Sequence, residues 1–277
     1  MGAALALALG WYAVAHRGGN EGPSAAPFTG GDLHSLVVDP ADPSRLFVGG
    51  HQAVAVSVDG AKSWQQVDSL EDADAMGWAF TADAVLVGGH PGLSVSTDGG
   101  RTFERRNGGL PATDIHALGA GGGVVYAASP QVGVFASSDG ARTWEVRTRG
   151  AGQAFMGRIL VDPSNRDHLV APDMRSGVVE SADGGRSWRS LGGVAGALWV
   201  SWDPGNPAHL IATGDGESVA SVDGGRSWTS LPAPAGASLL ELGPAGPDVV
   251  YAATHEAGSG RVKLEVSRDG GRTWTRP

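Results

Sequence analysis

The chain has 277 residues, of which 41% are hydrophobic, and its 20 basic against 29 acidic side chains give a formal charge of −9. This apolar content excludes disorder over most of the chain, and an acidic chain without a basic block is a poor nucleic-acid binder. The absence of cysteine excludes disulfides, thiolate zinc sites and a lipidated N-terminal cysteine, while 45 glycines indicate many tight turns rather than long helices.

The first segment, residues 1–17, has the features of a signal peptide or of a truncated membrane anchor. Its apolar run from Ala3 to Ala15 is shorter than the roughly 20 residues that span a bilayer. Ala13-Val14-Ala15 has the small-x-small form of a cleavage site. A buried first helix is the alternative. Residues 18–31 are rich in Gly, Pro, Ala and Ser, which predicts a flexible linker. We therefore expect an exported protein, either periplasmic, extracellular or anchored outside the cell.

One octet, with the pattern S-x-D-G-[GA]-[RK]-[ST]-[WF], occurs six times in residues 32–277. The first copy runs from Ser57 to Trp64 and the last from Ser267 to Trp274. Successive octet aspartates lie 39, 41, 44, 40 and 46 residues apart. This period is the length of one four-stranded propeller blade. The sequence therefore predicts an all-β fold, a six-bladed β-propeller over residues 32–277.

The first unit predicts strands A to D at residues 33–39, 46–50, 53–58 and 63–67. Asp-Gly between two apolar runs is a strong hairpin signal, so each octet forms the C–D turn of its blade. The carboxylate can accept backbone N–H bonds within the turn, and the aromatic can pack between blades. We expect twelve structural residues on this basis: Asp59, Asp98, Asp139, Asp183, Asp223, Asp269, Trp64, Phe103, Trp144, Trp188, Trp228 and Trp274.

These octets resemble the Asp-box, or BNR, repeat of sialidases, sortilin-type receptors, photosystem assembly factors and bacterial proteins described as glycosyl hydrolase-like. The resemblance covers the chain after residue 31. It implies a propeller with one Asp-box C–D turn per blade, and it implies little about function because the box is a structural turn in proteins of unrelated activity.

The loops opposite the octets form the predicted functional face. The A–B and C–D turns share one face of a propeller, whereas the B–C and D–A connections share the other, where the sequence stops repeating. Five of the eight histidines fall on this second face. The candidate ligand-binding residues are His34, His51, His90, His116, Arg158, Asp173, Asp215 and His255.

The sequence allows three interpretations of this face. The first is a metal-free site for a protein, glycan or small ligand, held by a monomeric binding module. The second is a divalent metal held by imidazoles, with His51, His90 and His255 as ligands, although no short metal-binding spacing is present. The third is an inert polar rim. No cofactor is required. The first interpretation, a metal-free ligand site, is preferred.

A glycoside hydrolase is the alternative function. A sialidase is not supported, because Tyr12 lies in the leader and Tyr126 and Tyr251 fall at core positions, so that no tyrosine is left as the nucleophile. Other glycosidases need only two carboxyls at a suitable separation. The candidates on the loop face are Asp173, Asp215, Glu217 and Glu256, together with Asp32 and Asp114.

Overall fold

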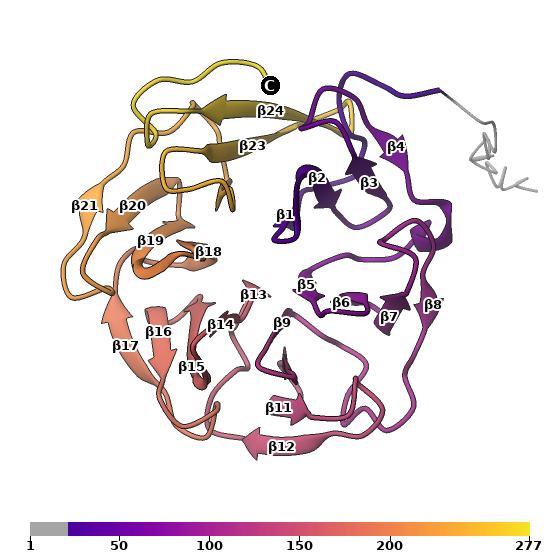
Figure 1. The fold of residues 1–277 in the computed structure, drawn as a ribbon, viewed down its shortest axis with the longest axis vertical. Coiled ribbons are helices and arrows are strands. Elements are labelled where there is room, and N and C mark those ends of the chain that lie inside the picture. The colour runs from indigo at the N-terminus through magenta and orange to yellow at the C-terminus, as the bar shows by residue number, and fades with distance from the viewer. Residues whose placement is uncertain (1–21) are drawn as a thin grey trace, which may run out of the picture.

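The computed structural model describes residues 22–277, so the predictions for residues 1–17 and for the start of the linker lie outside the described residues. Six small antiparallel sheets are arranged around a common centre, and in five of them the first strand is innermost (Figure 1). The six-bladed β-propeller predicted from the octets is confirmed. No helix in residues 22–277 is long and apolar enough to cross a membrane.

The first three blades follow the predicted order of strands from the centre outward. Blade one contains β1 (Ser35–Asp39), β2 (Asp42–Gly49), β3 (Val54–Ser57) and β4 (Gln65–Gln66), followed by a short 3₁₀ helix (Asp68–Leu70). Blade two contains β5 (Gly77–Phe80), β6 (Val85–Gly89), β7 (Gly92–Ser96) and β8 (Glu104–Arg105). Blade three contains β9 (Ala117–Gly121), β10 (Val124–Ser129), β11 (Gly133–Ser137) and β12 (Glu145–Thr148), and β13 (Gly157–Arg158) pairs in parallel with its inner strand.

The last three blades repeat the pattern with one exception. Blade four contains β14 (Leu160–Asp162), β15 (Asn165–Asp173), β16 (Gly177–Ser181) and β17 (Arg189–Gly192). Blade five contains β18 (Ala197–Asp203), β19 (Asn206–Gly214), β20 (Glu217–Ser221) and β21 (Thr229–Ser230). Blade six contains β22 (Leu239–Leu242), β23 (Val250–Glu256) and β24 (Arg261–Ser267), and its fourth strand is reduced to a bridge between Val266 and Thr275.

Each octet forms the same hydrogen-bonded turn, as blade four illustrates. The carboxylate of Asp183 accepts the backbone N–H groups of Arg186 at 3.0 Å and Ser187 at 2.9 Å, and the hydroxyl of Ser187 at 2.6 Å. The Ser181 hydroxyl accepts the N–H of Gly185 at 2.9 Å. Hydrogen bonds from the Ser187 hydroxyl, above all, lower the pKa of Asp183 to about 2. The carboxylates of the octet aspartates are thus occupied by hydrogen bonds within their own turns.

The octets and the A–B turns lie on one face, as predicted. The octet glycine donates its N–H to an A–B turn carbonyl of the same blade at 2.9 Å, from Gly60 to Ser44 and from Gly184 to Asp167. Two further blades repeat this bond at 2.9–3.0 Å. The loops that carry the candidate site therefore occupy the other face.

The octet aromatics do not all pack to the same depth. Trp64 and Phe103 are 2% and 7% exposed, whereas the other four are only half-buried. Trp64 is covered because the segment around Ser24 pairs with it through two backbone hydrogen bonds of 2.9 Å. Trp188 packs edge-on against Phe155, with 4.8 Å between the ring centroids, and its outer side faces solvent.

The prediction of a flexible linker is wrong for its described part, residues 22–31. This part is fastened to the propeller rather than free, because Thr29 is fully buried and donates its N–H to Gly260 at 2.9 Å. Val262 donates to the carbonyl of Pro27 at 2.9 Å, and the same segment pairs with Trp64 of blade one. The segment therefore joins blade six to blade one across the point where the ring closes.

Candidate functional site

An open cavity of about 410 Å³ lies among the loops of blades one to three. Four histidines, two aspartates and one methionine line it: His34, His51, Asp72, Asp74, Met76, His90 and His116. All four histidines belong to the set predicted from sequence, whereas the other three residues do not. The structure thus brings half of the predicted ligand-binding set together on the predicted face.

In each of blades one to three, the residue just before the first strand makes the same backbone hydrogen bond to the second strand. The N–H of His34 bonds to Gly49, that of Met76 to Gly88 and that of His116 to Ala128, at 2.9–3.0 Å. An aspartate stands two positions earlier each time, giving Asp32-Leu33-His34, Asp74-Ala75-Met76 and Asp114-Ile115-His116. The repeat of Asp-x-His or Asp-x-Met could have identified Asp74 and Met76 from sequence.

The Gly-Gly-His segments at the ends of β2 and β6 bring these aspartates close. A Cβ at Gly50 would collide with the carbonyl oxygen of Asp32, and one at Gly89 would collide with that of Asp74. Glycine therefore permits the close approach of backbone to backbone at both places. Neighbouring blades are also joined here, because Ala75 donates its N–H to Gly50 at 3.1 Å and Ile115 to Gly89 at 3.2 Å.

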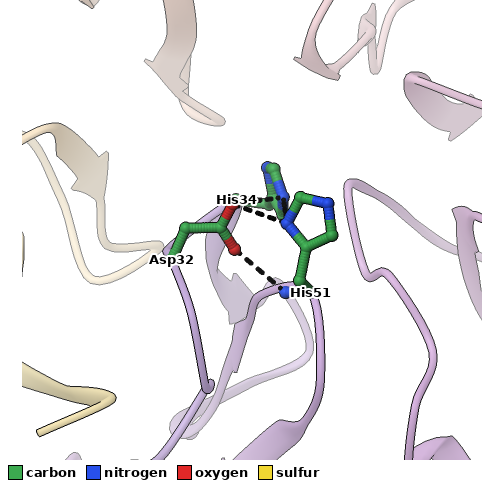
Figure 2. Close-up of side chains that lie close together, drawn as sticks. All are labelled: Asp32, His34 and His51. Atoms are coloured by element: carbon green, nitrogen blue, oxygen red, sulfur yellow. Dashed lines mark hydrogen bonds and ion pairs between the residues drawn. The ribbon is translucent and has the colours of Figure 1, made fainter. Parts of the chain in front are cut away.

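Two imidazoles and a carboxylate face one another at blade one (Figure 2). The Nδ1 atom of His51 lies 2.5 Å from Oδ2 of Asp32 and 2.8 Å from Nε2 of His34. Asp74 extends this group from blade two, with its Oδ1 3.3 Å from Nε2 of His34. The side chain of Asp74 is 10% exposed, and its Oδ1 is buried without a hydrogen-bond partner.

A second group of the same composition lies between blades two and three. The Oδ1 atom of Asp114 is 2.5 Å from Nε2 of His90 and 2.8 Å from Nε2 of His116. Neither contact has hydrogen-bond geometry, so this buried oxygen also has no hydrogen-bond partner. In each of the groups Asp32/His34/His51 and His90/Asp114/His116, the donor atoms all lie within 4.8 Å of one another.

The pKa of His34 is lowered from 6.5, because burial disfavours the charged imidazole. The nearby Asp74 and Asp32 oppose this shift, and the neighbouring His51 and His116 add to it. A lower pKa leaves His34 neutral at neutral pH, with a lone pair on one ring nitrogen.

Arg158 does not belong to this cavity. It lies on β13, a strand close to the propeller centre (Figure 1). Its guanidinium pairs with the carboxylate of Glu241 on β22. The indole N–H of Trp199 donates to the other carboxylate oxygen of Glu241 at 3.0 Å. Burial raises the pKa of Glu241, while the positive charge of Arg158 and the hydrogen bond from Trp199 lower it. Sequence reasoning missed Glu241, which stands in an apolar strand without a motif.

The other candidates are also separated from the cavity. Asp173 accepts the N–H groups of Arg175 at 2.7 Å and Ser176 at 3.0 Å within its own turn. Asp215 lies in a tight turn with φ of 46°, and Glu217 and Glu256 are exposed strand ends. None of the four proposed catalytic carboxylates lines the cavity.

His255 holds the place in blade six that His51 and His90 hold in theirs, yet it joins neither group. Its Nε2 contacts the carbonyl oxygen of Gly30 at 3.0 Å, so the N-terminal segment engages it. This corrects the metal set His51, His90 and His255: the structure brings His51 together with His34, and His90 together with His116.

The comparisons with known proteins identify the fold alone. No family model and no curated protein matches this chain. Among solved structures it is similar to the GH74 xyloglucanase from Xanthomonas campestris, with a TM-score of 0.61 and 18% identity over 92% of this chain and 46% of that one. It is similar to YCF48 bound to D1 peptide, with a TM-score of 0.58 and 20% identity over 92% and 84%. It is also similar to PorZ, a bacterial surface component of the type-IX secretion system of Porphyromonas gingivalis, with a TM-score of 0.56 and 12% identity over 89% and 32%.

These similarities agree with a six-bladed β-propeller. The chain spans less than half of the xyloglucanase and about a third of PorZ. Such propellers include both a hydrolase and a protein observed with a peptide, so the fold does not choose between the two classes of function. The choice between a hydrolase and a binding protein therefore depends on the residues that line the cavity.

Proposed function

We propose that the protein is an exported binding module that holds a positively charged ligand in the cavity of blades one to three. The observation that carries this proposal is the lining of the cavity, which contains four imidazoles and two aspartates but neither lysine nor arginine. Asp32 and Asp114 add two further carboxylates in contact with the lining histidines. Carboxylates without a lysine or arginine beside them give this cavity a negative field, which attracts cations.

The same charge argues against an acidic sugar as the ligand. Arginine is the side chain most often used to recognise a carboxylate, because its guanidinium can donate two parallel hydrogen bonds. Arg158, the arginine expected on this face, already pairs with the buried Glu241. A sialidase-like site is therefore disfavoured by electrostatics as well as by the absence of a tyrosine nucleophile.

The cavity has the size of a ligand site. Its volume of about 410 Å³ falls in the range of roughly 300–1,000 Å³ that is usual for small-ligand pockets. A basic side chain of a partner peptide would fit this volume and charge. A propeller of similar fold has been solved with a bound peptide, which makes a peptide a reasonable first ligand to test.

The test is fluorescence anisotropy on chelator-treated protein with labelled peptides that carry a central pair of lysines, arginines or neutral citrullines. We expect the basic peptides to bind and the citrulline peptide to bind at least about tenfold more weakly, a difference of about 1.4 kcal/mol. The double variant Asp72→Asn/Asp74→Asn should lose this preference. Asp83→Asn is the matched control, because Asp83 is exposed on the A–B turn of the same blade.

Equal binding of all three peptides by the wild type, or loss of binding in the Asp83 control, would contradict the proposal. The hydrolase alternative is tested in parallel with chromogenic glycosides. Turnover that is abolished by Asp32→Asn or Asp114→Asn would make the cavity an active site instead of a binding site.

Export is part of the proposal and has its own test. It is supported by the apolar run at residues 3–15 and the small-x-small motif that ends it. N-terminal sequencing of the protein recovered from outside the cell membrane should show a start just after Ala15. Recovery of the chain only in the cytoplasm would contradict export.

A further inference from the structure

The two His/Asp groups of the cavity have the composition of metal sites. Each offers two imidazole nitrogens and at least one carboxylate oxygen within 4.8 Å of one another. Donor atoms that ligate one transition ion at about 2.1 Å lie roughly 3 Å apart. The measured N···O separations around Asp32 and Asp114 run from 2.5 to 3.2 Å, which is close to that spacing.

Hydrogen bonds do not account for the arrangement at Asp114. Its Oδ1 is buried and faces two imidazole nitrogens at 2.5 and 2.8 Å, yet it has no hydrogen-bond partner. A buried acceptor without a donor is costly. A cation bound among these three atoms would satisfy all of them.

Potential ligand atoms also converge at blade one. Nδ1 of His51 contacts both Oδ2 of Asp32 and Nε2 of His34. Nearby, Oδ1 of Asp74 is nine-tenths buried with its side chain, lacks a hydrogen-bond partner and lines the cavity. A cation would give this carboxylate and both imidazoles a common partner.

The backbone of the blades builds both centres in one way. The Gly-Gly-His end of β2 and that of β6 each lie against the Asp-x-His or Asp-x-Met segment of the next blade, joined by the hydrogen bonds from Ala75 and Ile115. The histidines of both centres thus lie within two residues of a strand end. A preorganised set of donors of this kind lowers the cost of binding an ion.

The donor types indicate which ions would bind. Imidazole suits zinc, copper, nickel and iron, and four histidines line the cavity. Affinity at a nitrogen and oxygen site usually rises to copper(II) and falls again at zinc. Calcium and magnesium are disfavoured because they prefer all-oxygen sites.

We propose that the cavity binds two divalent first-row transition ions, copper(II) most tightly, one at Asp32/His34/His51 with Asp74 and one at His90/Asp114/His116. This inference rests on the proposed function, since it identifies the positively charged ligand of the same cavity as a pair of metal ions.

The experiment titrates the tag-free, chelator-treated chain with CuCl₂ and then with ZnCl₂ in an isothermal titration calorimeter. Metal content after dialysis is measured by atomic absorption. We expect two ions per chain for the wild type, one for His51→Ala, one for His90→Ala and none for the double variant. Copper(II) electron paramagnetic resonance should show nitrogen hyperfine splitting that weakens in each variant.

Two controls keep these outcomes interpretable. The side chains of His51 and His90 are each 56% exposed, so alanine should leave the thermal stability of the metal-free chain nearly unchanged. His168 is the matched control, because both of its ring nitrogens make aligned 2.9 Å hydrogen bonds, to Asp162 and Glu180, on another part of the ring. His168→Ala should still bind two ions.

Three results would overturn the inference: no bound metal in the wild type, a single ion lost equally in both variants, or two ions retained in the double variant. The first leaves the proposed function testable on its own, because the peptide assay uses chelator-treated protein and Asp72/Asp74 variants. Basic peptides that bind to a chain without metal affinity would refute the metal centres and retain the binding module.

Discussion

The buried pair between Arg158 and Glu241 gives the sharpest stability prediction. The side chain of Glu241 is 2% exposed and that of Arg158 is 20% exposed, so the carboxylate depends on its partner far more than the guanidinium does. Arg158→Met keeps much of the side-chain volume and removes the charge. The indole N–H of Trp199 would remain as a donor to Glu241.

The loss of stability in Arg158→Met depends on whether the Glu241 carboxylate stays charged or takes up a proton. Leaving a buried charge without its partner costs about 3–5 kcal/mol. Taking up a proton instead costs about 3.4 kcal/mol at pH 7 for a group whose ordinary pKa is 4.5, because each pH unit is worth about 1.36 kcal/mol. The cheaper route sets an upper limit, so we expect a loss of at most about 3 kcal/mol at pH 7 and at most about 1.4 kcal/mol at pH 5.5.

Burial raises the pKa of Glu241 in the folded chain, so between pH 4.5 and that raised pKa the unfolded state binds fewer protons than the folded state. The free energy of unfolding therefore falls as pH rises, and it falls more steeply when Arg158 is absent.

The assay is urea unfolding followed by tryptophan fluorescence at pH 5.5 and pH 7, with Glu241→Gln and the double variant as partners in a mutant cycle. The double variant should be more stable than Arg158→Met alone at pH 7, because glutamine has no charge to leave unpaired. The reasoning is refuted if Arg158→Met loses the same free energy at both pH values, or if the two single losses simply add.

Three further predictions concern the scaffold. Asp183→Ala should destabilise by about 1–3 kcal/mol through unsatisfied turn N–H groups. Because the pKa of Asp183 falls from 3.8 to about 2 in the folded chain, its contribution is full above pH 3.8 and is lost as pH falls toward 2. Guanidinium unfolding between pH 2 and 5 measures this, and an unchanged pH profile in Asp183→Asn would contradict it. Trp64→Ala should cost about 3–5 kcal/mol, whereas half-buried Trp188→Ala should cost clearly less, and equal losses on thermal unfolding would show that burial does not set the cost. Deletion through residue 31 should lower the melting temperature, because the N–H of Thr29 no longer bonds to Gly260, and an unchanged melting temperature would show that the ring closes without this segment.

The propeller could be predicted because its information is local and repeated six times. Each octet contains the serine, aspartate and glycine that its own turn needs, and the turn closes by hydrogen bonds within four residues, as at Asp183. The same locality explains why the two faces could be assigned, since the order of strands in a blade fixes which turns lie together. The four cavity histidines were found because aligning the blades places them at two equivalent positions on the loop face.

What the sequence did not determine depends on contacts between segments far apart in the chain. Whether an octet aromatic is buried depends on its neighbour: Trp64 is covered by the segment around Ser24, while Trp188 has no such cover. Arg158 appeared to be a rim residue because its partner Glu241 lies 83 positions away in an apolar strand. His255 matched His51 and His90 in the repeat, yet the backbone of Gly30, 225 positions away, engages it. A repeat pattern assigns each residue a position in its blade, but ring closure decides which residues from different blades meet, and that decision is made only in the tertiary structure.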